Sequence, residues 1–220
     1  MFLIVLGAGA IGKSLIELAL EKGHQVTLIE RNPERAKAAA EHLDIRIIHG
    51  DIAMGGILEE AGVEKADALI GTSGDDASNL MAMFLGREHK VPTLITIVNH
   101  KGHEKMFERL GAKILVDPEV LIAKHLFGML EQPTLESVFP LPHGAQVFEV
   151  VIGPEAKIAD LTLGEAGAQK ILPNDLLILW IQAGEDYRIP HGKTVLHPGD
   201  RIAVFTNRTV PPDELKIFTG

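Results

Sequence analysis

The chain has 220 residues, enough for one large domain or two modest ones, and its 46% hydrophobic and 23% charged residues are typical of a globular protein. A formal net charge of −9, with no basic block, argues against nucleic-acid binding. The chain contains no cysteine, which excludes a disulfide framework and a thiol nucleophile. No apolar run reaches the roughly 20 residues of a membrane span, and the N-terminus lacks signal-peptide features, so we expect a cytoplasmic protein.

The first twelve residues carry the most informative pattern. An apolar run over 2–6 predicts a buried strand, which ends in Gly7-x-Gly9-x-x-Gly12 just before a helical pattern. In dinucleotide-binding folds the first glycine allows a tight turn, the second admits a pyrophosphate, and the third lets the helix pack closely. The phosphates would lie at the helix N-terminus. The residues of this predicted phosphate loop are Gly7, Ala8, Gly9, Ala10, Ile11 and Gly12.

Strands and helices alternate from there to residue 131. Further strands are expected at 25–29, 45–48, 66–70, 93–98 and 114–116. Helices are expected at 10–22, 54–61, 101–110 and 118–131. A further helix is expected to begin at Pro33, and a long one, which follows Gly71–Asp76, is expected to end at Glu88. This alternation predicts an α/β fold, a doubly wound parallel sheet with helices on both faces and ligands at the carboxyl ends of its strands.

An acidic residue follows the glycine loop at the spacing expected for a ribose ligand. The strand over 25–29 ends at Glu30, 18 residues after Gly12. A carboxylate there accepts both hydroxyls of an adenosine ribose and repels a 2′-phosphate. Arg31 would favour such a phosphate, but Glu30 opposes it, so solvated surface is the expected place of Arg31.

Two further strand ends complete the predicted adenosine site. Asp51 and Ile52 would flank the adenine, while Thr72 and Ser73 would offer hydroxyl or backbone groups. A plain turn is the alternative for these segments, and Gly-Asp dipeptides such as Gly50-Asp51 commonly form one. The predicted site therefore draws on four loops at one edge of the sheet.

Other polar residues suggest structure rather than chemistry. Asp75 and Asp76 are expected to cap the long helix rather than to bind a ligand. His100 and His103 have a spacing that suits a metal, but no third or fourth ligand is evident nearby, so no metal site is expected. The sequence also lacks the common hydrolase, zinc-protease and P-loop motifs. We therefore expect a protein that is not an enzyme.

The helix predicted at 118–131 is apolar nearly all round. Pro118 suits its first position, with Asp117 as the cap. A helix that is apolar on every side must be covered on every side, and a second subunit is the expected cover. Its apolar residues are Val120, Leu121, Ile122, Ala123, Leu126, Phe127, Met129 and Leu130.

The pattern changes after a linker at 131–134. Short apolar runs separated by turns, with one short helix near 163–169, predict a small β-rich domain. These runs lie at 147–152, 176–181 and 201–205. The stretch from Pro211 onward is expected to be a tail or an edge. The predicted domains are 1–134, which includes the helix 118–131, and 138–220.

Over nearly its whole length the chain resembles the regulatory subunits of Trk and Ktr potassium-uptake systems, which contain RCK (regulator of potassium conductance) domains. The first half carries this resemblance in Gly7–Gly12, Thr27–Arg31, Gly50–Asp51, Ala66–Ile70, Gly74–Asp76 with Asn79, and Phe107–Ala112. The second half carries it in Ile189–Ile202, which is similar to the RCK-C signature.

The resemblance implies a Rossmann-like RCK-N domain followed by a small α+β RCK-C domain. It implies a cytoplasmic regulator, held at the inner face of the membrane by its partner, that gates a potassium transporter or channel. It also implies NAD(H) or ADP/ATP as ligand, and a homodimer or higher ring joined through the helix from Pro118. The implied contacts are Gly7, Gly9 and Gly12 to phosphates, Glu30 to ribose and Asp51 to the adenine side.

The chain departs from the family pattern at two places. Many relatives carry arginine at the position of Ala10 or Ile11, where it reaches a terminal phosphate, and many carry one near Thr96–Asn99. Two other functions stay open. A small NAD-dependent oxidoreductase is the main alternative, although the second domain is small for covering a substrate. A constitutive structural subunit with a vestigial nucleotide fold is the other.

Overall fold

The structure, a computed structural model, describes residues 1–141 and 143–220 with their side chains and residue 142 by its backbone. The chain divides into two compact units, Met1–Pro118 and Glu119–Gly220, each with its own hydrophobic core. The division falls at the start of helix α6 (Pro118–Glu131), whereas the sequence places the boundary after this helix. The predicted domain boundary therefore stays a prediction.

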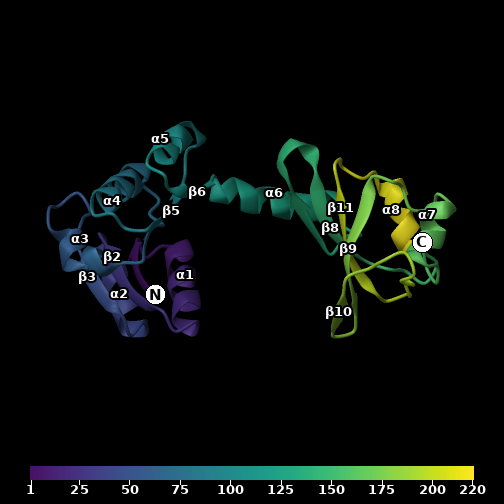
Figure 1. Ribbon diagram of the computed structural model, residues 1–220, viewed down its shortest axis with the longest axis horizontal. Helices are drawn as coiled ribbons and strands as arrows, with labels where there is room; N and C mark the ends of the chain where they lie inside the picture. Colours follow the sequence, from purple (N-terminus) through teal and green to yellow (C-terminus); the bar gives the residue numbers. More distant parts are fainter. The chain divides into compact units, whose positions relative to one another are not determined.

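The first unit, whose helices α1 to α5 are labelled in Figure 1, is built on a parallel six-stranded sheet with the order β3-β2-β1-β4-β5-β6. This strand order reverses direction beside β1, as in dinucleotide-binding folds, and it confirms the predicted fold class. The strands are β1 (Phe2–Leu6), β2 (Gln25–Glu30), β3 (Arg46–His49), β4 (Ala68–Gly71), β5 (Thr93–Val98) and β6 (Lys113–Val116).

Helices cover both faces of this sheet. Helices α1 (Ala10–Glu21) and α2 (Pro33–His42) bury Ile16 and Ala39 on one face. The opposite face carries α3 (Ile57–Glu60), α4 (Asp76–Glu88) and α5 (Glu104–Arg109), with the short 3-10 helices η1 (Val63–Lys65) and η2 (Lys101–His103). The helix predicted over 54–61 forms only at α3, because Gly56 before it has a left-handed φ of 87°.

Polar caps begin the helices that frame the sheet edge. The Asn32 side chain accepts a hydrogen bond from Arg35 N at 2.9 Å, and Pro33 occupies the first turn of α2, as the sequence predicts. Asp75 caps α4 by accepting from the backbone N–H groups of Ala77 and Ser78. Both caps lie just after strands, so they set where each helix leaves the sheet.

The second unit is an antiparallel five-stranded sheet with the order β10-β9-β11-β8-β7 and helices packed on it. It has the α+β character that the sequence predicts. Its strands are β7 (Ser137–Pro140), β8 (Gln146–Val151), β9 (Leu176–Ala183), β10 (Asp186–Arg188) and β11 (Arg201–Thr206). Its helices are α6, α7 (Leu163–Ala168) and α8 (Pro212–Thr219), with the 3-10 helix η3 (Pro142–Gly144).

The prediction of a tail or an edge from Pro211 onward is wrong, because residues Pro212–Thr219 form the helix α8. Leu215 and Phe218 are 1% and 0% exposed and lie in the core of the second unit. Their i, i+3 spacing places both side chains on one face of the helix, and Pro212 suits its first turn. Burial of that face therefore decides the structure of a segment whose two prolines suggest irregular chain.

Helix α6 leaves most of its apolar side chains exposed. In its own unit, His125 Nδ1 donates to Val138 O at 2.6 Å, and its ring stacks on Phe139 with centroids 4.6 Å apart. The exposed apolar side chains are Val120, Leu121, Ile122, Leu126, Phe127, Met129 and Leu130. Among the described residues, no helix is long and apolar enough to cross a membrane.

Candidate nucleotide-binding site

A hollow of about 580 Å³ opens at the carboxyl ends of the strands in the first unit. In a doubly wound sheet this edge, where the strand order reverses, is where ligands bind. The predicted site residues that line it are Gly7, Gly9, Glu30, Arg31, Asp51, Ile52, Thr72 and Ser73. The four loops predicted to meet there do meet.

The glycine loop has the geometry that its three glycines suggest. Gly7 has a φ of 101°, which favours glycine, and it forms the turn after β1. A Cβ on Gly12 would collide with the Gly7 carbonyl, so this glycine allows α1 to pack against the turn. A Cβ on Gly9 would meet nothing within 4 Å. The space over Gly9, at the N-terminus of α1, is the cradle that a phosphate group would fill.

Glu30 is a buried carboxylate held by two backbone N–H groups. It is 6% exposed, and its Oε2 accepts from Ala8 N at 2.5 Å while its Oε1 accepts from Asn32 N at 2.7 Å. These bonds tie the glycine loop to the end of β2. Each carboxylate oxygen keeps capacity for a further donor, so Glu30 remains able to accept ribose hydroxyls.

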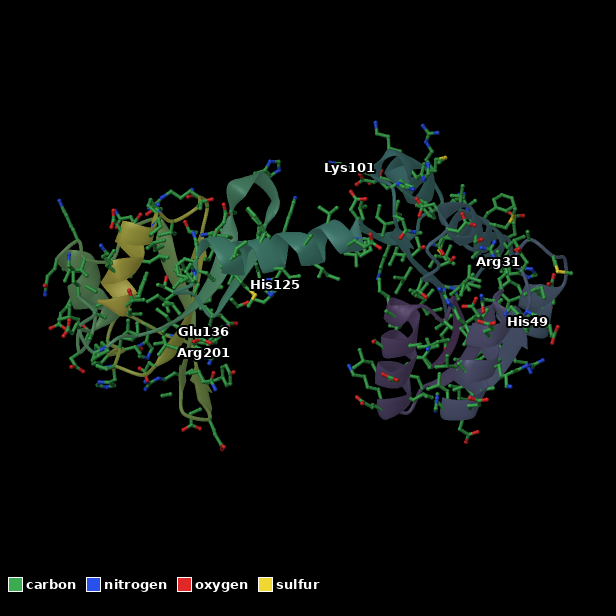
Figure 2. The ribbon with its side chains drawn as sticks, turned by 180° about the vertical axis from the view of Figure 1, so that it is seen from behind. Arg31, His49, Lys101, His125, Glu136 and Arg201 are labelled. Atoms are coloured by element: carbon green, nitrogen blue, oxygen red, sulfur yellow. The ribbon has the colours of Figure 1, made fainter. Side chains whose placement is uncertain are left out.

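Arg31 lies between two carboxylates at the rim of the hollow. Its Nη1 is 3.7 Å from Asp51 Oδ2 and 4.0 Å from Asp75 Oδ2, and its side chain is 63% exposed. His49 Nε2 lies 3.1 Å from the Arg31 carbonyl oxygen, and both residues are labelled in Figure 2. Arg31 is therefore exposed to solvent, as expected. Its side chain also joins the loops after β3 and β4 through these two carboxylates.

The remaining predicted contacts differ in how far they face the hollow. Asp51 Oδ1 accepts from Ala53 N at 2.9 Å, so this residue makes the turn that was the alternative and still lines the hollow. Ile52 is 2% exposed and belongs to the core. The Thr72 hydroxyl donates to the Leu6 carbonyl at 2.9 Å and also lies 3.0 Å from the Gly7 carbonyl, so it holds the turn.

Four predicted loop residues do not line the hollow. Ala8 contributes its N–H to Glu30 but its side chain is 2% exposed, and Gly12 packs against Gly7. Ala10 and Ile11 are exposed on the first turn of α1. Further lining residues outside the four predicted loops are Leu6, Ile29, Asn32, Pro33, Arg35 and Ser78, whereas Gly50, Gly74 and Asp75 belong to those loops. Their position beside the selected motifs is the signal that would have identified them.

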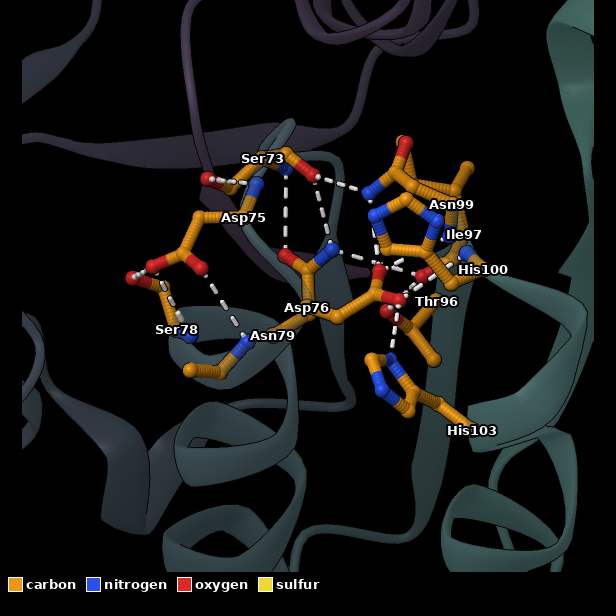
Figure 3. A network of polar contacts seen from close by, with 11 residues as sticks. Ser73, Asp75, Asp76, Ser78, Asn79, Thr96, Ile97, Asn99, His100 and His103 are labelled. Carbon is orange, nitrogen blue, oxygen red and sulfur yellow. Dashed lines mark hydrogen bonds and ion pairs between the residues drawn. The ribbon is translucent and has the colours of Figure 1, made fainter.

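Side chains from two elements fix the wall of the hollow at Ser73 (Figure 3). Ser73 N donates to Asn79 Oδ1 at 3.1 Å, and the Ser73 carbonyl accepts from Asn79 Nδ2 at 2.8 Å. The same carbonyl accepts from Asn99 Nδ2 at 3.2 Å. The Ser73 backbone is thus held both by α4 and by the residue that follows β5.

Asp76 anchors this network, and its expected role as a helix cap is wrong. Its carboxylate accepts from Asn99 N at 2.8 Å, from His100 N at 3.0 Å and from His103 Nδ1 at 2.7 Å. Burial of Asp76 opposes its ionisation, but the hydrogen bonds, led by that from Asn99 N, outweigh burial and lower the pKa of its carboxyl. The carboxylate therefore stays charged at neutral pH and holds the chain after β5.

The two histidines of the predicted metal spacing serve this network. Their rings contact edge to face with centroids 5.6 Å apart, and His103 donates to Asp76. Within the described residues there is no group of three or more histidine, cysteine, aspartate or glutamate side chains placed to hold a metal ion.

The family models match both units. The TrkA-N domain model matches residues 3–118, and the TrkA-C domain model matches residues 147–210. The chain belongs to the TrkA family. The residues of the candidate site lie within the TrkA-N match, and the RCK resemblance drawn from the sequence is confirmed.

One curated relative and two solved structures illustrate these similarities. The Trk system potassium uptake protein TrkA homolog of Methanothermobacter thermautotrophicus is 29% identical over 222 residues, which cover 100% of both chains. The GsuK channel bound to NAD has 18% identity and a TM-score of 0.64, covering 93% of this chain and 37% of the GsuK chain. GsuK bound to ADP has 23% identity and a TM-score of 0.51, and the match covers 59% of this chain and 34% of the GsuK chain. At 18% and 23% sequence identity, the similarity to these two structures establishes the fold alone.

Proposed function

We propose that this chain is a nucleotide-binding regulatory subunit that gates a membrane potassium transporter or channel. The observation that carries the proposal is the buried Glu30 carboxylate, held beside an open glycine cradle at the sheet edge. The full-length similarity to a Trk system potassium uptake protein supports the potassium system as the partner. The regulator would act at the inner face of the membrane through that partner.

The bound ligand would be an adenine nucleotide, NAD(H) or ADP/ATP. The phosphates would lie over Gly9 at the N-terminus of α1, and Glu30 would accept the ribose hydroxyls. Asp51 and the Ser73 wall would flank the adenine. GsuK structures bound to NAD and to ADP support both nucleotide classes.

The same site would disfavour a ribose 2′-phosphate. Glu30 would repel it directly. The positive charge of Arg31 is shared between two carboxylates, those of Asp51 and Asp75, which lowers its attraction for a third anion. NADP is therefore expected to bind more weakly than NAD.

A second copy of the chain would cover α6. Seven large apolar side chains of this helix are exposed, far more than a solvated helix carries. A further apolar hollow of about 550 Å³ lies between α4 and α5, lined by Leu80, Met81, Phe84 and Met106. Two separate apolar surfaces on one chain would allow a ring of several subunits. In such a ring, α6 would belong to the first domain, as the predicted domain 1–134 has it.

The switch would be a change in how paired subunits are arranged. A nucleotide shifts such an equilibrium only if it binds the two arrangements with different affinity. The Ser73 wall, which is hydrogen-bonded to α4, and the glycine turn before α1 would pass the ligand's contacts to these two helices. No catalytic step is part of this proposal.

Calorimetric titration with NAD, NADH, ADP, ATP and AMP tests the nucleotide site. We expect at least one ligand to bind, with affinity reduced at least tenfold in Glu30→Ala, because the variant removes the ribose acceptor and the anchor of the glycine loop. Glu34→Ala is the matched control, since Glu34 is exposed on α2 and does not line the hollow. No binding by any of the five ligands would contradict the proposal.

A substitution at Gly9 separates binding from folding. Because a Cβ there meets no protein atom within 4 Å, Gly9→Ala should leave the melting temperature nearly unchanged while it weakens nucleotide binding at least tenfold. Unchanged affinity in Gly9→Ala would show that the phosphates do not lie over this residue. Steady turnover of NADH with a metabolite panel would instead favour the oxidoreductase alternative.

A further inference from the structure

A third hollow, of about 500 Å³, lies on the first unit away from the candidate nucleotide-binding hollow. Its lining includes Gln25 and Thr27 at the start of β2 and Arg46 at the start of β3. Lys65 at the end of η1 completes its polar residues. Glu30 and the glycine loop lie at the other end of these strands, so the two hollows share no lining residue.

The strand register explains why these side chains gather. Thr27 pairs with Arg46 across β2 and β3, and Phe2 pairs with Gln25 across β1 and β2. In a parallel sheet, paired residues point to the same face, as do residues two apart along one strand. Gln25, Thr27 and Arg46 therefore share the face that α3 to α5 cover.

A short connection between β3 and β4 leaves one end of this face uncovered. Between β3 and β4 the chain forms only the four-residue α3 and the three-residue η1, whereas α4 has 13 residues. Gly62 precedes η1 with a left-handed φ of 83°, and a Cβ there would lie 3.4 Å from the Phe2 ring. The connection thus turns beside Phe2 and leaves the first residues of β2 and β3 without a covering helix.

The hollow is cationic in a chain whose net charge is −9. Arg46 and Lys65 both line it, and neither has a carboxylate within 4 Å among the described residues. Other arginines of the chain, such as Arg31 and Arg208, lie beside two carboxylates each. The two charges are therefore available to an anion.

Thr27 supplies a buried hydroxyl at the same place. The residue is 2% exposed, and its hydroxyl makes no hydrogen bond within the described part of the chain. The buried threonines Thr72 and Thr96 instead donate to backbone carbonyls. Thr27 lines the hollow, and its pairing with Arg46 places both side chains on the same face of the sheet.

We propose that this hollow binds a compact oxyanion, the phosphate group of a small metabolite, through Arg46, Lys65 and the Thr27 hydroxyl. Two cations and a hydroxyl donor match the charge and the acceptor oxygens of a phosphate. The Gln25 amide adds a further donor at the rim. Because the site is distinct from the nucleotide hollow, its ligand would be a second input to the same domain.

Titration of the full-length, deuterated protein with inorganic phosphate, followed by amide NMR at constant ionic strength, tests this site. We expect saturable shifts at Thr27 and Gly62. The double variant Arg46→Gln/Lys65→Gln should weaken binding at least tenfold, and Thr27→Val, which keeps the shape of the side chain, about threefold. Lys22→Gln/Lys37→Gln is the control, because it removes the same charge from exposed positions just after α1 and on α2.

Succinate as a second probe distinguishes phosphate from a carboxylate ligand. Stronger binding of phosphate than of succinate is expected, and the reverse order would overturn the assignment to phosphate. Absent or non-saturable shifts at Thr27 and Gly62, or equal affinity in the Arg46→Gln/Lys65→Gln variant, would overturn the site itself. Shifts confined to Gly9 and Gly12 would report phosphate on the glycine loop, which leaves the nucleotide site supported and this proposal refuted.

Discussion

Two buried carboxylates, Glu30 and Asp76, hold the loops around the candidate nucleotide-binding hollow by accepting backbone N–H groups. Glu30 joins the glycine loop to the end of β2, and Asp76 joins the start of α4 to the chain after β5. Hydrogen bonds to a carboxylate are stronger than those between neutral groups. The position of each loop therefore depends on one carboxylate side chain.

Asp76→Asn should lower the free energy of unfolding of the first unit by about 2 kcal/mol at neutral pH, because a neutral amide replaces a charged acceptor. The pKa of Asp76 is lowered in the folded protein, so its contribution is complete above the unfolded pKa, near 4. It is lost as the pH falls through the folded pKa. The difference between wild type and variant should therefore shrink below about pH 4, as scanning calorimetry can measure.

Asp44→Asn is the control for this experiment, since Asp44 is exposed between α2 and β3. It should change the unfolding free energy by less than about 0.5 kcal/mol at every pH. A destabilisation by Asp76→Asn that stays constant from neutral to acidic pH would show that the charge of Asp76 does not support the fold.

Helices α6 and α8 of the second unit differ in how far their apolar side chains are buried within that unit. Phe218 of α8 lies in the core, where its ring contacts Phe148 edge to face with centroids 6.1 Å apart. Ile122 and Leu126 of α6 are 57% and 61% exposed. In the proposed assembly, a second subunit would cover these side chains of α6.

Charges on α6 should break the proposed subunit contact. Ile122→Glu/Leu126→Glu places two carboxylates on the apolar face, one turn apart, where their desolvation in a dimer would be costly. Light scattering should show a halved particle mass at micromolar concentration, with the secondary structure unchanged. Lys124→Glu, an exposed position of the same helix, should keep the wild-type mass. An unchanged mass in the double variant would exclude α6 as the dimer contact.

Loss of the Phe218 ring should destabilise the second unit by about 3–5 kcal/mol, since Phe218→Ala leaves a cavity in the core. The single tryptophan, Trp180, lies on β9 of this unit, so its fluorescence reports urea unfolding there. Lys216→Ala removes only a surface pair with Asp213 and should cost less than about 1 kcal/mol. Equal effects of the two substitutions would contradict the burial of α8.

At the scale of the whole molecule, local patterns predict the two-part architecture but not all of its contacts. The glycine spacing and the alternation of strands and helices predict the parallel sheet, because both depend on residues near in sequence. Helix α8 escapes prediction, because its burial depends on distant strands. The role of Asp76 escapes it for the same reason, since its partners follow more than 20 residues later.

A bound adenine nucleotide should change the arrangement of paired subunits, and a distance between protomers measures this directly. Because the chain has no cysteine, Glu185→Cys in the turn between β9 and β10 introduces one spin label per protomer. We predict that saturating nucleotide shifts the inter-label distance distribution, and that Glu30→Ala abolishes the shift. The same distribution with and without a nucleotide that calorimetry shows to be bound would contradict the regulatory function.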